Sequence, residues 1–190
     1  MDIKEIKKKL KDELGGKRYD HTMGVMYTAA SLAMKYRCNM DDCLLAGLLH
    51  DCAKYVDDKE KIKICKKNNI EISEAELMNP SLLHAKVGAY LAKTKYDVTD
   101  ENILHAIEVH TTGEPGMSLL DKIIFVADYI EPGRNQAPRL DEVRETAFNN
   151  LDDALEMILH DTLEYLKDKS AVLDPKTKST YDYYRRKHDS

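Results

Sequence analysis

The sequence feature that most constrains this chain is a histidine–aspartate pair at the end of an apolar run. Residues 43–49 are apolar throughout, and His50 and Asp51 follow them directly. Such a run enters a protein core, where a carboxylate is rarely buried without a partner. An imidazole nitrogen and a carboxylate oxygen delivered together suit a first-row transition metal. The pair alone does not exclude the alternative, a capping histidine beside a solvated aspartate at a helix end.

Hydrophobic periodicity predicts an all-α chain. Apolar residues recur at helical spacing from Ile3 to Leu14, and the Gly15-Gly16 step predicts a stop. Asp41 is expected to cap the helix that carries His50. The alternating pattern of a β-strand is not seen anywhere in the sequence. Further helices are expected over about residues 18–36, 57–67, 79–96, 100–110, 118–130, 141–149 and 152–166, of which 118–130 is central because residues 123–127 are apolar on every side.

The length and composition fit one soluble domain. Its 190 residues suit an N-terminal helix (1–16), a core (18–166) and a C-terminal tail (167–190) that packs on the core. The 8 Gly, 5 Pro and absent Trp argue against a turn-rich all-β fold. The formal net charge of −5 argues against binding to a nucleic acid polymer. No apolar run approaches the ~20 residues of a membrane span, so no membrane contact is expected.

The cysteines and the first residues indicate the compartment. The first ten residues have no apolar core, so they are not a signal peptide. The 4 Cys form no Cys-x-x-Cys pair, which argues against a zinc knuckle. Cys52, beside Asp51, is interpreted as a small buried residue rather than a ligand. A reducing, cytoplasmic location is expected.

Several further ionisable residues lie on or beside apolar helix faces. Taken singly, each would more often be a satisfied core residue than a metal ligand. Taken together, so many inward ionisable groups would be costly without a common purpose, which favours a shared metal site. His105, His160 and His188 lack this context and are expected to be packing or surface residues. The candidate ligands outside the central pair are His21, His84, His110 and Asp128.

Three glycines support the same selection of histidines. Gly24, Gly47 and Gly88 each lie within one helical turn of a candidate ligand. Glycine inside a helix costs about 1 kcal/mol relative to alanine, and a close approach between helices is the usual compensation. The three glycines therefore predict that helices are drawn together around one site.

The ordered set of candidate ligands resembles that of the HD-domain metal-dependent phosphohydrolases. The local motifs are similar to those of the YqeK-type symmetrical bis(5′-nucleosyl)-tetraphosphatases. The resemblance runs from about residue 18 into the C-terminal helices, and the first helix and the tail carry no matching motif. The motifs are Arg18-Tyr19-x-His21-x-x-Gly24-Val25, His50-Asp51-x-x-Lys54, His84-x-x-x-Gly88-Ala89, His110-Thr111-x-Gly113 and Lys122-Ile123-x-x-x-Ala127-Asp128-Tyr129-Ile130-Glu131-Pro132-Gly133-Arg134.

The resemblance implies an HD-type helical bundle that hydrolyses diadenosine tetraphosphate, or a related dinucleoside polyphosphate, to two ADP. It implies two metal ions, with iron the metal associated with the family; the ligand types alone allow Fe, Mn, Co, Ni or Zn. The metals would activate a water for attack on phosphorus. One ion would be held by His21, His50, Asp51 and Asp128, and Asp51 would bridge to a second ion held by His84 and His110.

Other residues are candidates for contacts with the substrate. Lys54 lies one turn beyond His50 and is expected to neutralise charge on the leaving phosphate, with Asp51 as its catalytic partner. Arg18 and Arg134 are candidates for phosphate contacts, and a surface charge or a carboxylate partner is the alternative for each. The nucleoside candidates are Glu131 and Asn135.

Two smaller roles and three broader alternatives stay open. Asp121 would either orient a ligating histidine or cap its own helix, and Thr111 would either end a helix or serve the site. The chain could instead hydrolyse another nucleotide, such as a nucleoside triphosphate or a guanosine alarmone. It could be a non-catalytic nucleotide-binding module, or a helical scaffold without metal. The expected partner is a small molecule, and the Tyr-rich tail leaves a homodimer open.

Overall fold

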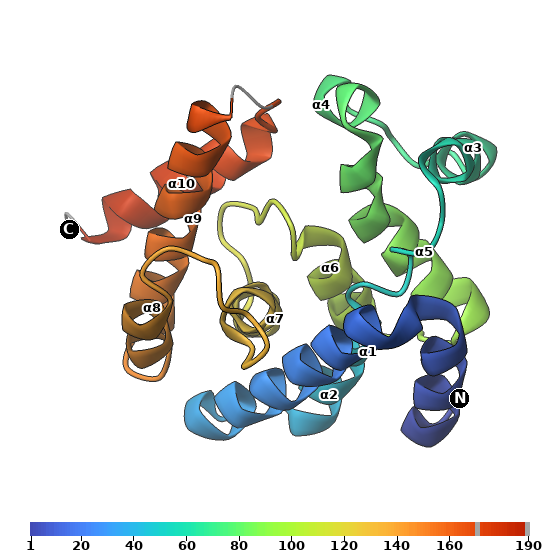
Figure 1. Ribbon diagram of the computed structural model, residues 1–190, viewed down its shortest axis with the longest axis horizontal. Helices are drawn as coiled ribbons and strands as arrows, with labels where there is room; N and C mark the ends of the chain where they lie inside the picture. The colour runs from blue at the N-terminus through green and yellow to red at the C-terminus, as the bar shows by residue number, and fades with distance from the viewer. Residues whose placement is uncertain (170–171, 189–190) are drawn as a thin grey trace.

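The computed structural model describes residues 1–169 and 172–188, and side chains as far as residue 186. Every regular element in these ranges is a helix, which confirms the all-α prediction (Figure 1). No helix in the described ranges is long and apolar enough to cross a membrane. The elements are α1 (Ile3–Tyr36), α2 (Met40–Leu49), α3 (Asp58–Lys67), α4 (Glu74–Met78), the 3₁₀ turn η1 (Pro80–Leu83), α5 (His84–Lys95), α6 (Glu101–Val109), α7 (Leu119–Ile130), α8 (Leu140–Ala147), α9 (Leu151–Asp168) and α10 (Pro175–His188).

Helix α7 is the centre of the bundle. It is seen end-on in Figure 1, and it packs against α1, α2, α6, α8 and α9. Residues 123–127 are all buried, as their apolar pattern predicts. Ser118 caps the helix and the side chain of Asp121 completes a capping box, so α7 begins where the sequence indicates. The helix thereby delivers Asp128 from the middle of the core.

Helix α1 changes direction at the glycines that predicted a stop. Gly15 has φ 64° and ψ 159°, a backbone conformation that suits glycine, and the helix resumes directly after it. The longer second part packs along α2. The cap of α2 differs from the expectation: the side chain of Asn39 accepts hydrogen bonds from the backbone of Asp41 and Asp42. Asn39 has the extended backbone that an N-cap requires, so Asp41 lies inside the first turn.

The three glycines beside the candidate ligands do mark close approaches, as predicted. A Cβ on Gly24 would collide with the carboxylate of Glu131. A Cβ on Gly47 would lie 3.0 Å from the Cα of Met26, and one on Gly88 would lie 3.3 Å from Ile107. Helices α1, α2 and α5 therefore approach their neighbours closely at these three positions, which lack a side chain.

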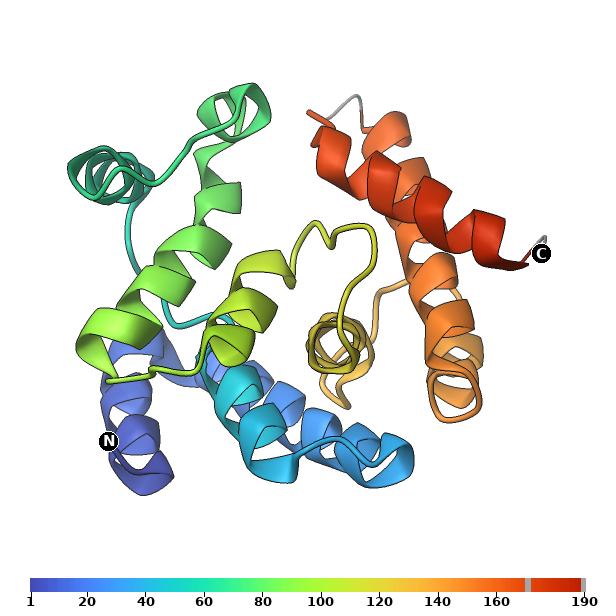
Figure 2. The ribbon, with the colours of Figure 1, turned by 180° about the vertical axis from the view of Figure 1, so that it is seen from behind.

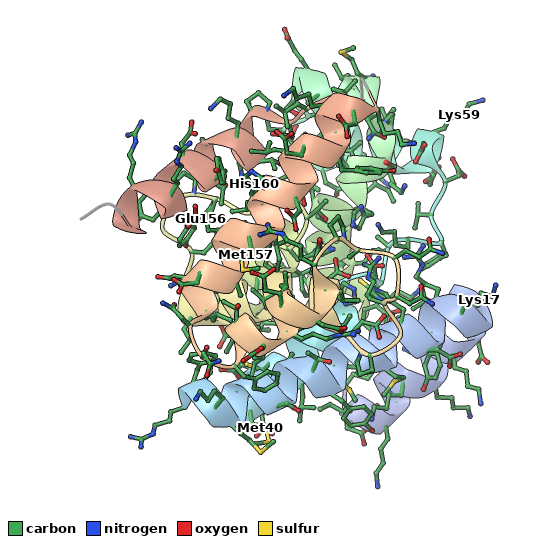
Figure 3. The ribbon with its side chains drawn as sticks, turned by 60° about the vertical axis from the view of Figure 1, so that its left-hand side comes forward. Lys17, Met40, Lys59, Glu156, Met157 and His160 are labelled. Carbon is green, nitrogen blue, oxygen red and sulfur yellow. The ribbon has the colours of Figure 1, made fainter. Side chains whose placement is uncertain are left out.

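Two helices were not predicted from the sequence. Helix α4 is a five-residue segment capped by Ser73 that packs against η1. Beside it, residues of α3, η1 and α5 form a small second core. Helix α10 covers most of the tail and lies against α9 (Figure 2). Its Tyr184 is only 1% exposed and belongs to the main core, whereas Lys17, Met40 and Lys59 project outwards (Figure 3).

Candidate metal centre

Five helices deliver the six candidate ligands to one place. His21 lies on α1, His50 and Asp51 follow the last turn of α2, and His84 begins α5. His110 follows the last residue of α6, and Asp128 lies on α7. Three sets of donor atoms result, each with its atoms within 4.8 Å of one another. They are His21, His50 and Asp51; His50, His110 and Asp128; and Asp51, His84 and His110.

Three of the histidines have a defined tautomer. The Nδ1 atoms of His50, His84 and His110 lie 2.7 Å from the backbone carbonyls of Gly47, Ser81 and Ile107, each three residues earlier. A carbonyl only accepts, so each Nδ1 carries the proton and each Nε2 presents a lone pair. A metal-ligating imidazole usually donates the proton of its other ring nitrogen to such an acceptor.

The Nε2 atoms of these histidines lie close together, and the protein does not supply a hydrogen-bond donor for each of them. Those of His84 and His110 are 3.2 Å apart, although neither carries a proton to share. The hydroxyl of Thr111 lies 3.1 and 3.2 Å from the same two atoms and can donate to only one of them. The Nε2 of His50 is buried with no hydrogen-bond partner. Converging lone pairs in a dry interior fit a bound cation.

Asp51 offers one oxygen to each group of histidines. Its Oδ1 lies 3.4 Å from the Nε2 of His84 and 3.6 Å from that of His110. Its Oδ2 lies 3.7 Å from the Nε2 of His50 and 3.9 Å from that of His21. A carboxylate divided in this way has the geometry of a bridge between two neighbouring ions.

The protonation states of His50, His84 and Asp51 agree with a metal-binding donor set. At His21, by contrast, burial is outweighed by the carboxylates of Asp128 and Glu131, which raise its pKa. Burial lowers the pKa of His50 to about 4 and lowers that of His84 well below its usual range, so both are neutral near pH 7. Burial alone would raise the pKa of Asp51, but His50, His110 and Lys54 lower it well below its ordinary value. Neutral imidazoles around ionised carboxylates are the form that binds first-row metals.

Three cationic side chains surround the centre. Arg18 Nη1 lies 2.9 Å from Asp51 Oδ2, and Lys54 Nζ lies 3.6 Å from Asp51 Oδ1. Arg134 donates from Nη2 to Asp128 Oδ1 at 2.8 Å, and from Nε to the backbone carbonyl of the same residue. Each arginine therefore has the carboxylate partner that was the alternative to a phosphate contact. Arg18 and Arg134 are also exposed enough to reach a ligand above the centre.

Glu131 lines the cavity beside His21, where the sequence predicts a nucleoside contact, and it also contacts His21 itself. Its side chain is buried, and the residue is 3% exposed. Its Oε1 lies 3.1 Å from His21 Nδ1, and its Oε2 accepts from the Gly133 backbone at 2.6 Å. With its Oε1 beside His21 and its Oε2 on Gly133, Glu131 is placed to orient His21, and its nucleoside contact stays a prediction. The sequence could not show this because its partner is 110 positions away.

Asn135 and Arg134 line the same open cavity as Glu131, which measures about 650 Å³ and lies beside His21. Tyr129 and Tyr165 supply aromatic surface to the same cavity. Its volume lies within the ~300–1,000 Å³ range of small-molecule sites. The structure thus brings Asn135 and Arg134 to one cavity at the edge of the candidate metal centre.

The remaining histidines and Asp121 lie outside the donor sets. Asp121 completes the capping box of α7, and its Oδ1 lies 3.1 Å from His105 Nδ1 as an ion pair, so of its two expected roles the structure has the cap. His160 lies at the surface beside Asp161. The side chain of His188 falls outside the described part of the chain. Thr111, whose role was left open, contacts two candidate ligands; its position directly after His110 was the available signal.

The fold and the site define the class of protein. The family model described as HD domain matches residues 18–133, a segment that contains all six candidate ligands. The chain belongs to the HD-domain family. The resemblance stated from the motifs alone is therefore confirmed at the level of the family.

More closely similar proteins narrow this assignment. The chain is 42% identical over 176 residues to a symmetrical bis(5′-nucleosyl)-tetraphosphatase of Bacillus subtilis, with 92% of each chain covered. It is 40% identical to the protein of that name from Halalkalibacterium halodurans, with 91% of each covered. A Clostridium acetobutylicum structure, described as a predicted HD superfamily hydrolase involved in NAD metabolism, superposes with a TM-score of 0.95. It is 41% identical, and 98% of each chain is covered.

Proposed function

We propose that this protein hydrolyses diadenosine tetraphosphate symmetrically, giving two ADP. The observation that carries the proposal is the division of Asp51 between two groups of histidines, one of which holds two unprotonated Nε2 atoms 3.2 Å apart. The names of the B. subtilis and H. halodurans relatives supply the substrate class. In the reaction, a water oxygen adds to one central phosphorus, the bridging P–O bond breaks, and each ADP keeps two phosphates.

The donor set fits two transition-metal ions. His21, His50, Asp51 and Asp128 would hold the first, and Asp51, His84 and His110 would hold the second. Bound there, the ions would lower the pKa of a water and neutralise charge on the phosphate oxygens. We propose iron, on the family resemblance, with Mn, Co, Ni and Zn as the metals that the same ligands accept.

The cationic side chains serve the phosphates in this proposal. Lys54 is buried enough for desolvation to lower its pKa, yet it stays beside Asp51, where it offsets charge on the leaving phosphate. Arg18 pairs with Asp51, and Arg134 pairs with Asp128. From these positions the two arginines bind phosphates on either side of the centre. Asn135 contacts the nucleoside in the cavity beside Arg134. Glu131 acts as a positioning residue for His21.

The four free cysteines are consistent with a reducing compartment, so we place the enzyme in the cytoplasm. Its partner in this proposal is a small molecule rather than a membrane or a nucleic acid polymer. Because α10 packs on α9 of the same chain and buries Tyr184, the tail does not need a second subunit to cover it.

Product analysis on protein of measured metal content tests the proposal. Purified protein is incubated with diadenosine tetraphosphate, and the products are separated by ion-exchange chromatography. ADP as the sole nucleotide product, with about two metal ions per chain, is the expected result. AMP with ATP would exclude symmetrical cleavage. An intact dinucleotide beside rapid hydrolysis of a nucleoside triphosphate or a guanosine alarmone would reassign the substrate, and a metal-free protein would favour a binding module or a scaffold.

A further inference from the structure

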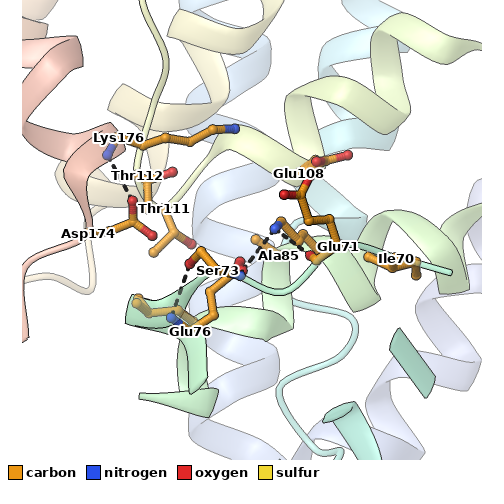
Figure 4. Close-up of a pocket in the computed structure, with 12 residues that line it drawn as sticks. Ile70, Glu71, Ser73, Glu76, Ala85, Glu108, Thr111, Thr112, Asp174 and Lys176 are labelled. Carbon is orange, nitrogen blue, oxygen red and sulfur yellow. Dashed lines mark hydrogen bonds and ion pairs between the residues drawn. The ribbon is translucent and has the colours of Figure 1, made fainter. Parts of the chain in front are cut away.

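A second cavity lies on the other side of the candidate metal centre from the cavity beside Arg134. It measures about 290 Å³ and is enclosed by η1, α5, α6, the segment before α4 and the start of α10 (Figure 4). Ile70, Leu82 and Ala85 supply its apolar surface, and Glu71, Glu108 and Thr112 are among its polar residues. Its volume is close to the lower end of the ~300–1,000 Å³ range for small-molecule sites.

This cavity adjoins the candidate ligands through Thr111. Thr111 lines it and also lines a smaller cavity of about 180 Å³ beside His110 and Asp128. That smaller cavity shares Tyr129 and Arg134 with the 650 Å³ cavity. The three cavities therefore follow one another past the metal centre. The two outer ones begin beside Thr111 and beside Arg134.

The charges of the 290 Å³ cavity do not suit phosphate. Four carboxylates line it, against two lysines. Lys86 is already engaged, since it lies 2.9 Å from a Glu76 oxygen and 2.8 Å from the Glu71 carbonyl. The cationic groups Arg18, Lys54 and Arg134 lie instead at the metal centre. A polyphosphate is thus attracted to the centre and repelled from the cavity.

An uncharged nucleoside has the complementary chemistry. Its ribose hydroxyls and the exocyclic amine of adenine donate hydrogen bonds, which carboxylates such as Glu108 accept. The faces of the base are apolar enough to lie against Ile70 and Leu82. Glu108 is exposed on α6 and lines the cavity, so its carboxylate is accessible to a ligand there.

Resting on the proposed function, we propose that the cavity lined by Thr111, Thr112 and Glu108 holds the second nucleoside of the substrate. The first nucleoside lies in the 650 Å³ cavity beside Arg134, and the phosphate chain crosses the metal centre between them. Each nucleoside is then joined through two phosphates to the bond that breaks. Two binding cavities, one on each side of the centre, hold the scissile bond at the middle of the chain.

Comparing two substrates distinguishes loss of the second nucleoside site from general damage to the metal centre. Diadenosine tetraphosphate carries a nucleoside at both ends, whereas adenosine 5′-tetraphosphate carries one, which takes the roomier cavity. The variants are Glu108→Gln, which weakens the acceptor, and Thr112→Phe, which fills the cavity. Glu101→Gln is the matched control, because it makes the same change on the same helix at an exposed residue outside the cavity. Melting temperatures check that each variant is folded.

The expected result is a KM for diadenosine tetraphosphate raised about three- to tenfold in both cavity variants, the size of effect expected from weakening one ordinary hydrogen bond. The KM for adenosine 5′-tetraphosphate and all values for Glu101→Gln stay within about twofold. An equal effect on both substrates, or no effect on either, overturns the assignment. Calorimetric binding of a diadenosine tetraphosphate analogue with a methylene group at the central bridge tests the cavity even if the wild type releases no ADP. A wild type that releases no ADP would contradict the proposed function, and the binding measurement would still test the cavity.

Discussion

Replacing Glu131 with glutamine tests whether His21 is held from beneath by a buried carboxylate. Glu131 has two acceptor oxygens and two donors to serve, the Nδ1 of His21 at 3.1 Å and the Gly133 backbone at 2.6 Å. Glutamine has the same shape but one acceptor oxygen. If that oxygen serves Gly133, the amide nitrogen faces His21 and drives the ring proton onto Nε2, which removes the lone pair that a metal needs. If it serves His21, the Gly133 donor is left facing an amide nitrogen.

The expected size follows from this arrangement. One unsatisfied donor at a position that is 3% exposed costs roughly 1–3 kcal/mol. Loss of an outer partner of a ligating histidine typically lowers metal affinity 10- to 100-fold, which is about 1.4–2.7 kcal/mol. The two figures agree, so we expect Glu131→Gln to weaken one metal site by that factor and to lower kcat in parallel.

The assay measures metal affinity by calorimetric titration. Activity and melting temperature are measured on the same samples. Glu145→Gln is the control, because Glu145 is exposed on α8 and away from the centre. Gly24→Ala gives an independent perturbation, since its Cβ would displace the Glu131 carboxylate. Wild-type metal affinity in Glu131→Gln would refute the positioning role, whatever its activity.

The other predictions concern the bridge, the phosphates and pH. Asp51→Asn should keep the helical circular dichroism spectrum but reduce kcat more than about 100-fold, beyond the range of outer-shell residues; unchanged turnover would exclude the bridging carboxylate. Arg134→Ala should raise the KM for diadenosine tetraphosphate about tenfold with little change in melting temperature, and an unchanged KM would leave the arginine a partner of its carboxylate only. Burial lowers the pKa of His105, but Asp121 and Glu114 outweigh it and raise the value. The stability from this pair is full below about pH 6.5 and is lost as pH rises through the raised pKa; with a side chain 42% exposed it is under about 1 kcal/mol. His105→Gln should therefore lower the melting temperature at pH 6 and not at pH 9, and an equal loss at both would refute the charge effect.

Local sequence signals account for most of the helices. Periodicity and capping residues located α7 and α6, because burial of one face and satisfaction of the first backbone donors are local properties. Helices α4 and α10 were not predicted, because their local signals are weak. The first has five residues, and the second is mostly polar with Tyr184 as its inward anchor, so neither has a strong periodic face.

The convergence of the six candidate ligands could also be predicted from the sequence. A histidine on an apolar face beside a glycine indicates both inward direction and close approach, and Gly24, Gly47 and Gly88 do contact neighbouring helices. The contact between Glu131 and His21 could not be predicted from the sequence. The motif around Glu131 suggested a loop residue near the substrate, and Glu131 does line the cavity beside His21, but its contact with His21 depends on how α7 packs against α1.

What the sequence determined by itself was the helical class, the identity of the inward ionisable residues and the family they resemble. These follow from burial patterns along single helices and from local motifs. Only the tertiary structure decided that Asp51 turns one oxygen to each group of histidines, that Glu131 lies beneath His21, and that cavities lie on both sides of the centre. The physical reason is that periodicity specifies which face of a helix is buried. The partner that meets this face is set by packing between segments that are remote in the chain.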